Sequence, residues 1–250
     1  MVARLPSKFG TLLVFDDGPW RCLAFNTRRS VQSCRHRQHP LSFRYEYVPM
    51  MFAAALARPA ARRVVVLGLG GAALPQLFHH YRPAAVVDTV EIDPAVVKAA
   101  NRWFGYRARA TEKVYVEDAA RFVQRPALRG RYDLVLLDCY GEHFIPAHLQ
   151  RRAFLRGVRS LLTPRGAVVS NIWQTHPRYR DLVRQYVELF PQVWILPGHE
   201  SGNAMVIASR APLFRHRDAL IKRALRLEAR SRPLLPPLVP HLRRLKRAPR

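Results

Sequence analysis

The sequence has few cysteines and no apolar stretch long enough to cross a membrane. Its three cysteines, Cys22, Cys34 and Cys139, are odd in number and show no C-x-x-C spacing, which argues against a disulfide framework or a zinc site. The histidines also lack H-x-x-x-H or mixed Cys/His spacing, so no metal is expected. The longest apolar stretch, Met50 to Ala57, is far too short to span a bilayer, and the N-terminus has no apolar signal core. We therefore expect a cytoplasmic protein with no membrane partner.

Acidic residues are also scarce. Against 42 lysines and arginines, nearly all of them arginine, stand 17 aspartates and glutamates, which gives a formal net charge of +25. A field of this sign attracts nucleic acid or other anionic partners. No interleaving of aromatic and basic residues marks a single binding face, so solvated guanidinium groups scattered over the surface are the simpler interpretation. At 250 residues and 49% hydrophobic content, the chain can form one large α/β domain with a small appendage.

The most informative feature that is present is a strand, turn, helix and strand unit over residues 63–94. Its first apolar run leads into a turn that contains three glycines: Gly68, Gly70 and Gly71. Its second apolar run ends in Glu91 and Asp93. Glycines let the backbone turn tightly beside a ligand, and a carboxylate at the end of the next strand can accept hydrogen bonds from ribose hydroxyls. The unit predicts a site for a nucleoside-containing cofactor, with a purely structural turn as the alternative.

Strands and helices alternate regularly from this unit onward. Strands are expected at 63–67, 86–91, 113–116, 133–138, 166–171, 192–196 and 203–208. Helices are expected at 72–81, 94–103, 118–124, 147–162 and 177–189. This alternation predicts an α/β fold with a doubly wound, mostly parallel seven-stranded sheet, which binds ligands at the carboxyl ends of its strands. The last two strands have no helix between them, which indicates an antiparallel pair at one sheet edge, as in methyltransferase-like folds.

The sequence predicts three regions. Residues 1–58 form a small β-rich region, with a β-hairpin at 11–25 and a linker helix at 48–57. Residues 59–209 form the cofactor-binding catalytic domain. Residues 210–250 differ in composition, because they contain a basic helix near 216–230 followed by a stretch rich in proline and arginine. We expect this end of the chain to be solvated or loosely packed, with contact to an anionic partner as the alternative.

Two further carboxylates, Asp118 and Asp138, are expected at the ends of the third and fourth strands. Because the carboxyl ends of parallel strands meet at one edge of a sheet, these two and Glu91 should converge. Carboxylates accept hydrogen bonds from hydroxyls and amines, such as a ribose, an adenine amino group or a reacting amine. For Asp118 a simple helix N-cap is the alternative, since aspartate before an apolar helix is a common cap.

Seven segments between the hairpin and about residue 210 carry a family resemblance. They are Val31 with Gln32 and Ser33, Tyr47 with Met50, GLGGAAL, VEIDPAVV, VEDAARF, YDLVLLDCY with Pro146 and Ala147, and ESGNAMVIAS. Together they resemble the spermidine synthases, the polyamine aminopropyltransferases, and most of all their shortened spermidine-synthase-like relatives. The resemblance implies a class I S-adenosylmethionine-dependent methyltransferase type of fold. It also implies decarboxylated S-adenosylmethionine or S-adenosylmethionine as cofactor, an amine substrate, a place in polyamine biosynthesis and a homodimer.

The resemblance also implies roles for individual residues. Glu91 would bind the cofactor ribose, Asp118 with Ala119 the adenine, and Gln32 the side of the sulfur. The rest of the predicted cofactor site consists of Gly68, Gly70, Gly71 and Asp93. Asp138, with Tyr140 beside it, would be the base, because an ammonium must lose a proton before it can attack the carbon next to the sulfonium. Residues predicted to bind the acceptor are Tyr47, Glu142, His199 and Glu200.

The chain departs from the family at positions that hold the amine substrates. The family has an aspartate at Gly71, a second aspartate at Gly141, a glutamate at Pro49 and a tyrosine at His199. Glu142 and Glu200 are candidates to replace the lost carboxylates, with exposed loop residues as the alternative. Methyl transfer from S-adenosylmethionine is therefore an alternative function. A further alternative is a catalytically weak nucleoside-binding protein whose basic tail contacts nucleic acid.

Overall fold

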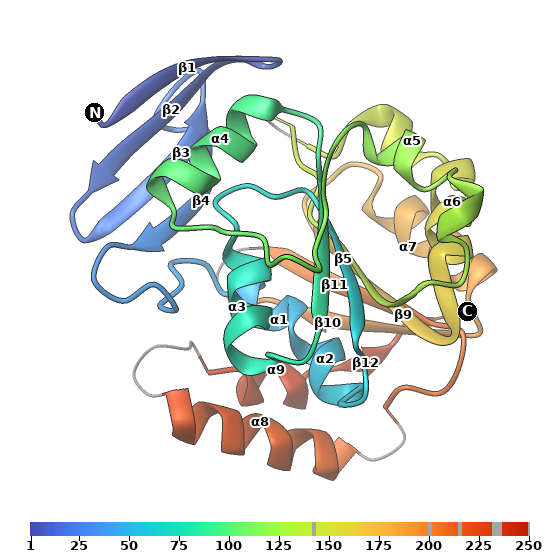
Figure 1. Ribbon diagram of the computed structural model, residues 1–250. Helices are drawn as coiled ribbons and strands as arrows, with labels where there is room; N and C mark the ends of the chain where they lie inside the picture. Colours follow the sequence, from blue (N-terminus) through green and yellow to red (C-terminus); the bar gives the residue numbers. More distant parts are fainter. Residues whose placement is uncertain (142–143, 200–201, 215–216, 232–236, 250) are drawn as a thin grey trace.

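The strands form two separate sheets in the computed structural model, which describes all residues except 142–143, 200–201, 215–216, 232–236 and 250 (Figure 1). The smaller sheet is antiparallel and consists of β1 (Ala3–Ser7), β2 (Gly10–Asp17), β3 (Trp20–Phe25) and β4 (Val31–His36). The predicted hairpin is confirmed as β2 and β3, and two further strands flank it. The N-terminal region is thus a full sheet rather than a lone hairpin.

A disulfide joins β3 to β4. Cys22 and Cys34 are register partners on these strands, and their sulfurs are bonded. The expectation of no disulfide was wrong, because strand pairing, which brings the two cysteines together, leaves no mark on their spacing in the sequence. Cys139 is a free thiol.

The larger sheet has the order β12-β10-β11-β9-β8-β5-β6-β7. Its strands are β5 (Arg63–Leu67), β6 (Val86–Glu91), β7 (Val114–Val116), β8 (Tyr132–Leu137), β9 (Leu162–Trp173), β10 (Gln192–Pro197), β11 (Asn203–Ser209) and β12 (Lys246–Arg247). Strands β5 to β9 are parallel, whereas β11 is antiparallel to both β9 and β10. The seven predicted strands and the antiparallel pair are confirmed. Their order in the sheet is that of class I methyltransferases, and β12 adds an eighth strand at one edge.

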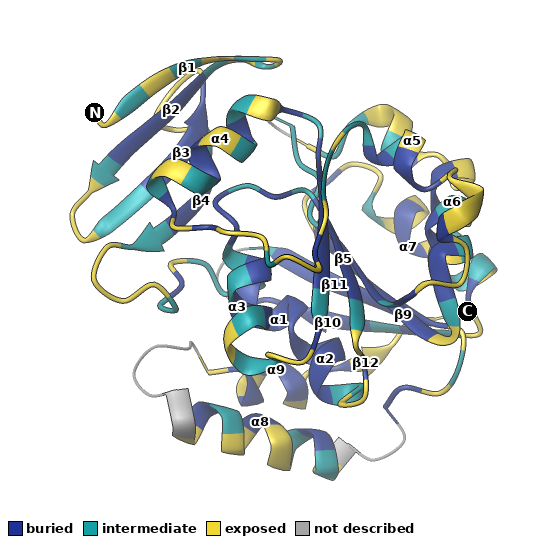
Figure 2. Ribbon diagram, viewed as in Figure 1, coloured by how far each residue is buried: buried dark blue, intermediate teal, exposed yellow. Residues whose placement is uncertain are grey.

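Helices cover both faces of this sheet, so its strands are buried between them (Figure 2). On one face lie α1 (Tyr47–Met51), α2 (Ala53–Ala57), α3 (Ala73–Tyr81), α8 (Arg217–Ser231) and α9 (Val239–Arg243). On the other lie α5 (Ala119–Phe122), α6 (Arg152–Leu161) and α7 (Tyr179–Leu189), with the short 3₁₀ helices Pro126–Leu128 and Ala147–Gln150. Helix α4 (Pro94–Trp103) packs against β1 and β2, so it connects the two sheets. The helices predicted at 48–57 and 147–162 are each divided into two short ones.

The end of the chain packs on the large sheet, contrary to the expectation of a solvated tail. Leu238 and Leu242 are fully buried, and β12 pairs with β10. Leu238, Leu242 and Leu245 recur at the spacing of one helix face, and Pro240 lies in the first turn of α9, where a helix needs no backbone N–H. Proline therefore starts this helix instead of preventing it.

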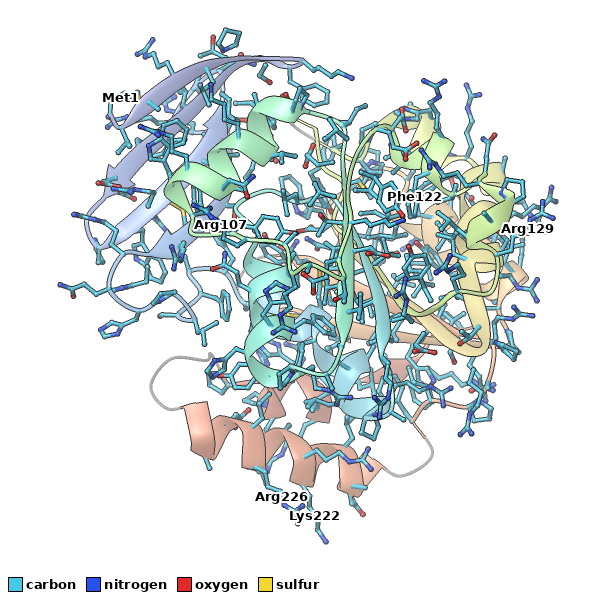
Figure 3. All side chains as sticks on the ribbon, in the orientation of Figure 1. Met1, Arg107, Phe122, Arg129, Lys222 and Arg226 are labelled. Atoms are coloured by element: carbon cyan, nitrogen blue, oxygen red, sulfur yellow. A yellow bond between two sulfur atoms is a disulfide. The ribbon has the colours of Figure 1, made fainter. Side chains whose placement is uncertain are left out.

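Basic side chains point outward from separate parts of the surface. Lys222 and Arg226 project from α8, and Arg129 projects from another side of the molecule (Figure 3). This distribution agrees with scattered, solvated arginines. No helix among the described residues is long and apolar enough to cross a membrane.

Candidate active site

A cavity of about 1060 Å³ lies at the carboxyl ends of the central strands. Its lining comes from the segments that follow β5, β6, β7 and β8, from the end of β9, and from β3 and β4 of the small sheet. Known ligand pockets of about 300 to 1,000 Å³ enclose a drug-sized ligand, so this space is large enough for a nucleoside cofactor and a small second substrate. Predicted site residues that line it are Gln32, Tyr47, Gly68, Gly70, Glu91, Asp118, Ala119, Asp138 and Tyr140.

Glu91 fixes the glycine-rich turn from the end of β6. Its Oε2 accepts a hydrogen bond from the backbone N–H of Leu69 and its Oε1 one from that of Asp93, both at 3.0 Å. Burial raises the pKa of Glu91, and the backbone donors, including that of Gly70, oppose the rise. The carboxylate thus holds the turn in shape at the cavity wall.

Two of the turn glycines lie where an added Cβ would come too close to neighbouring atoms. Gly68 has a φ of +94°, and a Cβ there would lie 2.2 Å from the carbonyl oxygen of Asp138. Gly71 lies outside the cavity, and a Cβ on it would lie 2.7 Å from Ser33 Oγ and 3.0 Å from the ring of Phe104. An aspartate at position 71 would therefore require the Ser33 hydroxyl and the Phe104 ring to shift.

Asp93, predicted to bind the cofactor, also lies outside the cavity. Its Oδ1 accepts a hydrogen bond from the N–H of Ala95 at 2.9 Å and so caps α4. Its Oδ2 accepts hydrogen bonds from the Ser7 hydroxyl and from the N–H of Lys8. Asp93 therefore joins the small sheet to α4. Its role as a helix cap is also indicated by the sequence, because an aspartate directly before a proline is typical of a helix start.

Asp118 both caps a helix and lines the cavity. Its Oδ1 accepts a hydrogen bond from the N–H of Ala120 at 2.7 Å, at the start of α5. Its Oδ2 lies 3.0 Å from Nε2 of His148, which also lines the cavity. The two alternatives that the sequence left open for Asp118 are thus compatible with each other.

Asp138 lies at the end of β8, where its carboxylate accepts two side-chain hydrogen bonds. One comes from Nδ2 of Asn171 at 2.9 Å and the other from the hydroxyl of Tyr47. Nδ2 of Asn203 donates to Oδ1 of Asn171 at 2.6 Å, which turns the Asn171 NH₂ group toward Asp138. Burial raises the pKa of Asp138 to about 6 in spite of the two donors. The result is a carboxylate that ionises near neutral pH at the wall of a large cavity.

Aromatic side chains surround this carboxylate. The hydroxyl of Tyr140 donates to the carbonyl oxygen of Asn171 at 3.1 Å and accepts from the N–H of Trp173 at 3.2 Å. The Tyr140 ring stacks on Trp173 with centroids 5.3 Å apart, and Phe144 meets Trp173 edge-on. Burial and the charge of Asp138 raise the pKa of both Tyr47 and Tyr140. The two tyrosines are therefore neutral, with the hydroxyl of Tyr140 held by backbone.

The residues predicted to bind the acceptor substrate lie in different places. Tyr47 lines the cavity from α1, and His199 lies outside it. Glu142 and Glu200 lie outside the described residues. Gln32 lines the cavity, with its Nε2 donating to the carbonyl oxygen of Ser30 at 3.2 Å.

Cavity residues that were missed from the sequence include Arg29, Glu46, Asn171 and Asn203. Glu46 directly precedes a predicted site residue, Tyr47, which is the only sequence signal for it. Both asparagines lie in predicted strands; Asn203 belongs to the segment ESGNAMVIAS, which gave it no role, and Asn171 belongs to no motif. Within the described part of the chain, no group of three or more His, Cys, Asp or Glu residues is placed to hold a metal ion.

Comparisons with known proteins identified similar sequences. A family model described as spermine/spermidine synthase domain matches residues 46–196. A polyamine aminopropyltransferase of Vibrio vulnificus is 32% identical over 208 residues, which are 81% of this chain and 69% of that protein. An eEF1A lysine and N-terminal methyltransferase of Bos taurus is 33% identical over 118 residues, which are 44% of this chain and 17% of that protein.

Two solved structures show the same fold. The crystal structure of a probable spermidine synthase from Corynebacterium glutamicum has a TM-score of 0.76 at 18% identity and covers 90% of this chain and 87% of its own. Human methyltransferase-like protein 13 in complex with SAH has a TM-score of 0.63 at 23% identity and covers 82% of this chain and 94% of its own. The fold is thus one that aminopropyltransferases and methyltransferases share.

Proposed function

Because this chain belongs to the spermine/spermidine synthase domain family, we propose that it is a transferase that moves the aminopropyl group of decarboxylated S-adenosylmethionine to an amine acceptor. The observation that carries the proposal is the position of Asp138. Its carboxylate faces the cavity, held by Tyr47 and Asn171, with the cofactor-type elements of the turn and Glu91 lining the same space. In this function the protein takes part in polyamine biosynthesis.

The residues present fit an adenosylmethionine-type cofactor. Glu91 supplies a carboxylate for ribose hydroxyls, and Asp118 with Ala119 supplies an acceptor and a backbone N–H for an adenine. Decarboxylated S-adenosylmethionine supplies a carbon made electrophilic by the adjacent sulfonium. Gln32 and Gly70 line the wall between the small sheet and the turn, on the side proposed for the sulfur. A homodimer, an anionic partner and a cytoplasmic location stay predictions.

Asp138 would prepare the acceptor for attack. An ionised carboxylate first binds the acceptor ammonium and then takes its proton, leaving a lone pair on nitrogen. As the new nitrogen–carbon bond forms, the carbon–sulfur bond breaks and its electron pair stays on sulfur, which leaves methylthioadenosine. The raised pKa of Asp138, about 6, makes it a stronger base than an exposed aspartate while keeping it ionised at pH 7.5.

The test is turnover by the purified protein. Formation of methylthioadenosine from decarboxylated S-adenosylmethionine and a panel of amines is measured with the native chain and with Asp138→Asn. The variant should lose about 10²- to 10⁴-fold in kcat while its cofactor affinity stays within a few fold. The native rate should fall as the pH drops below about 6, because Asp138 becomes protonated. Full turnover by Asp138→Asn, or no methylthioadenosine with any amine, would refute the proposal.

A second candidate function, methyl transfer from S-adenosylmethionine, is favoured by Arg29. This arginine lines the cavity three residues before Gln32, and it forms no ion pair with an acidic residue in the described part of the chain. Its guanidinium could bind the carboxylate that only S-adenosylmethionine carries. The glycine at position 71 points the same way, since no aspartate is present there to repel that carboxylate. Tighter calorimetric binding of S-adenosylmethionine than of its decarboxylated form, lost in Arg29→Gln, would establish this alternative.

A further inference from the structure

Basic side chains project from several sides of the molecule, but those on α6 form one row along the helix. Arg152, Arg156 and Arg159 are exposed, whereas the apolar side chains of α6 are buried against the large sheet. The three positions are i, i+4 and i+7, so the arginines lie on one side of the helix. At 1.5 Å of rise per residue, they follow each other at about 4.5 to 6 Å along the helix axis. The α6 row, as we call these three residues, is thus a continuous line of positive charge.

A second row lies on the segment from α5 to the turn after the adjacent 3₁₀ helix. Its members are exposed arginines spaced four residues apart: Arg121, Arg125 and Arg129. The segment packs along α6, because Val123 Cγ2 lies 2.6 Å from the place of a Cβ on Gly157 and the N–H of Gly130 donates to the carbonyl oxygen of Ser160 at 2.9 Å. Figure 1 shows α5 and α6 side by side. This α5 row and the α6 row are therefore neighbours on one face of the molecule.

Acidic side chains offset little of the charge on this arginine face. Arg125 pairs with Glu117 and Arg152 pairs with Glu188, each at 2.7 Å. The other four arginines of the two rows form no ion pair within the described part of the chain. None of the six lines the cavity. Like charges gathered in this way create a local positive potential that attracts anions.

The chemistry of the arginine face fits the phosphates of duplex nucleic acid. A guanidinium group binds a phosphate through two parallel hydrogen bonds. Among the described aromatic residues only Phe144 and Trp173 are exposed, and both line the cavity, so the two rows offer unpaired bases no stacking surface. The apolar side of α6 is buried, so this helix has none to insert into a membrane. A duplex carries phosphates on two strands, which two neighbouring rows can contact together.

We propose that the arginine face, formed by the α5 row and the α6 row, binds duplex nucleic acid through its phosphate backbone without reading the base sequence. The inference is independent of the proposed function, because neither row lines the cavity. It also concerns a different surface from the C-terminal region, for which the sequence left contact to an anionic partner open.

The experiment measures binding of a short labelled DNA duplex by fluorescence anisotropy at several salt concentrations. Each neutralised phosphate contributes about −0.9 to the slope of log K against log salt concentration, so the four arginines without an ion pair predict a slope of about −3.6. The double variant Arg156→Gln with Arg159→Gln should make the slope less steep by about 2 and lower the affinity at about 0.1 M salt by about 50- to 100-fold. Arg121→Gln with Arg129→Gln should have the same effect.

The matched control is Lys222→Gln with Arg226→Gln, which removes the same charge from α8 on another side of the molecule (Figure 3). It should keep the native slope and lose less than about threefold in affinity, because salt screens charges beyond about 10 Å. An unchanged Tm shows that each variant is folded. No binding by the native chain, or an equal loss in the control and in the row variants, would overturn the proposal.

Further probes test the identity of the partner. Two DNA duplexes of unrelated sequence should bind equally, and a clear preference for one would overturn binding through the backbone alone. An RNA duplex of the same length distinguishes the two sources of the phosphates, and dependence on both rows with either duplex supports the proposal. Single-stranded oligothymidine and phosphatidylserine vesicles should bind more weakly. Equal binding of either one, with the same dependence on the two rows, would refute the assignment to a duplex.

Discussion

Replacing Asp138 by asparagine should make the protein more stable at neutral pH while it lowers kcat by about 10²- to 10⁴-fold. Burial raises the pKa of Asp138 to about 6 in the folded chain, whereas an unfolded aspartate titrates near 3.9. Between these values the folded state binds more protons than the unfolded state. The free energy of unfolding therefore falls as the pH rises from about 4 to about 6 and is level above that. Ionised Asp138 is thus a destabilising group at neutral pH.

The size of the effect follows from the two pKa values. A difference of about two units corresponds to at most about 3 kcal/mol at pH 7.5 and to about half of that at pH 5. An asparagine at 138 can offer its oxygen to Nδ2 of Asn171 and its NH₂ group to the hydroxyl oxygen of Tyr47, and it never ionises. Asp138→Asn should therefore gain up to about 3 kcal/mol at pH 7.5, about half as much at pH 5, and nothing below about pH 3.5.

Urea denaturation of the native chain and the variant at three pH values measures this difference. Comparing the two chains at each pH cancels the contributions of all other titrating groups. A variant that is equally or less stable at pH 7.5, or a stability difference that does not shrink on acidification, would refute the reasoning. The expected result would show that the site trades stability for a reactive carboxylate.

Two more substitutions test the packing. Gly71→Asp should lower the Tm without improving affinity for decarboxylated S-adenosylmethionine. The reason is that a Cβ there would lie 2.7 Å from Ser33 Oγ and 3.0 Å from the Phe104 ring. If thermal unfolding gives the variant the Tm of the native chain, this space is open. Leu242→Ala should lower the free energy of unfolding by about 2–5 kcal/mol in urea, since the side chain is fully buried; a loss below about 1 kcal/mol would contradict a packed C-terminal segment.

The central strands could be predicted because burial on both faces demands a continuous apolar run. Strands β5 and β6 begin and end at the predicted residues. Strand β4, by contrast, has the sequence VQSCRH, whose strand character comes from pairing with β3 rather than from its own pattern. The C-terminal segment was missed for a similar reason, because its few leucines are buried only against helices and strands from elsewhere in the chain.

The residues of the candidate site also include some that could be predicted from the sequence and some that could not. Glu91, Asp118 and Asp138 could be brought together from the sequence, because the ends of parallel strands meet at one edge. Asn171 and Asn203 could not, since their contact depends on β9 and β11 being neighbours and on the register between them. Glu46 was missed because its contacts come from α9, which forms only through long-range packing.

The surroundings of Gly71 couple the evolution of that position to two others. Ser33 comes from β4 and Phe104 from the end of α4, and together they fill the space beside the glycine. An aspartate there requires the Ser33 hydroxyl to rotate away and the fully buried Phe104 ring to move by a few tenths of an ångström. A substitution at Ser33 or Phe104 therefore changes the cost of an aspartate at position 71. The three positions form an epistatic set, in which the effect of one substitution depends on the residues at the other two.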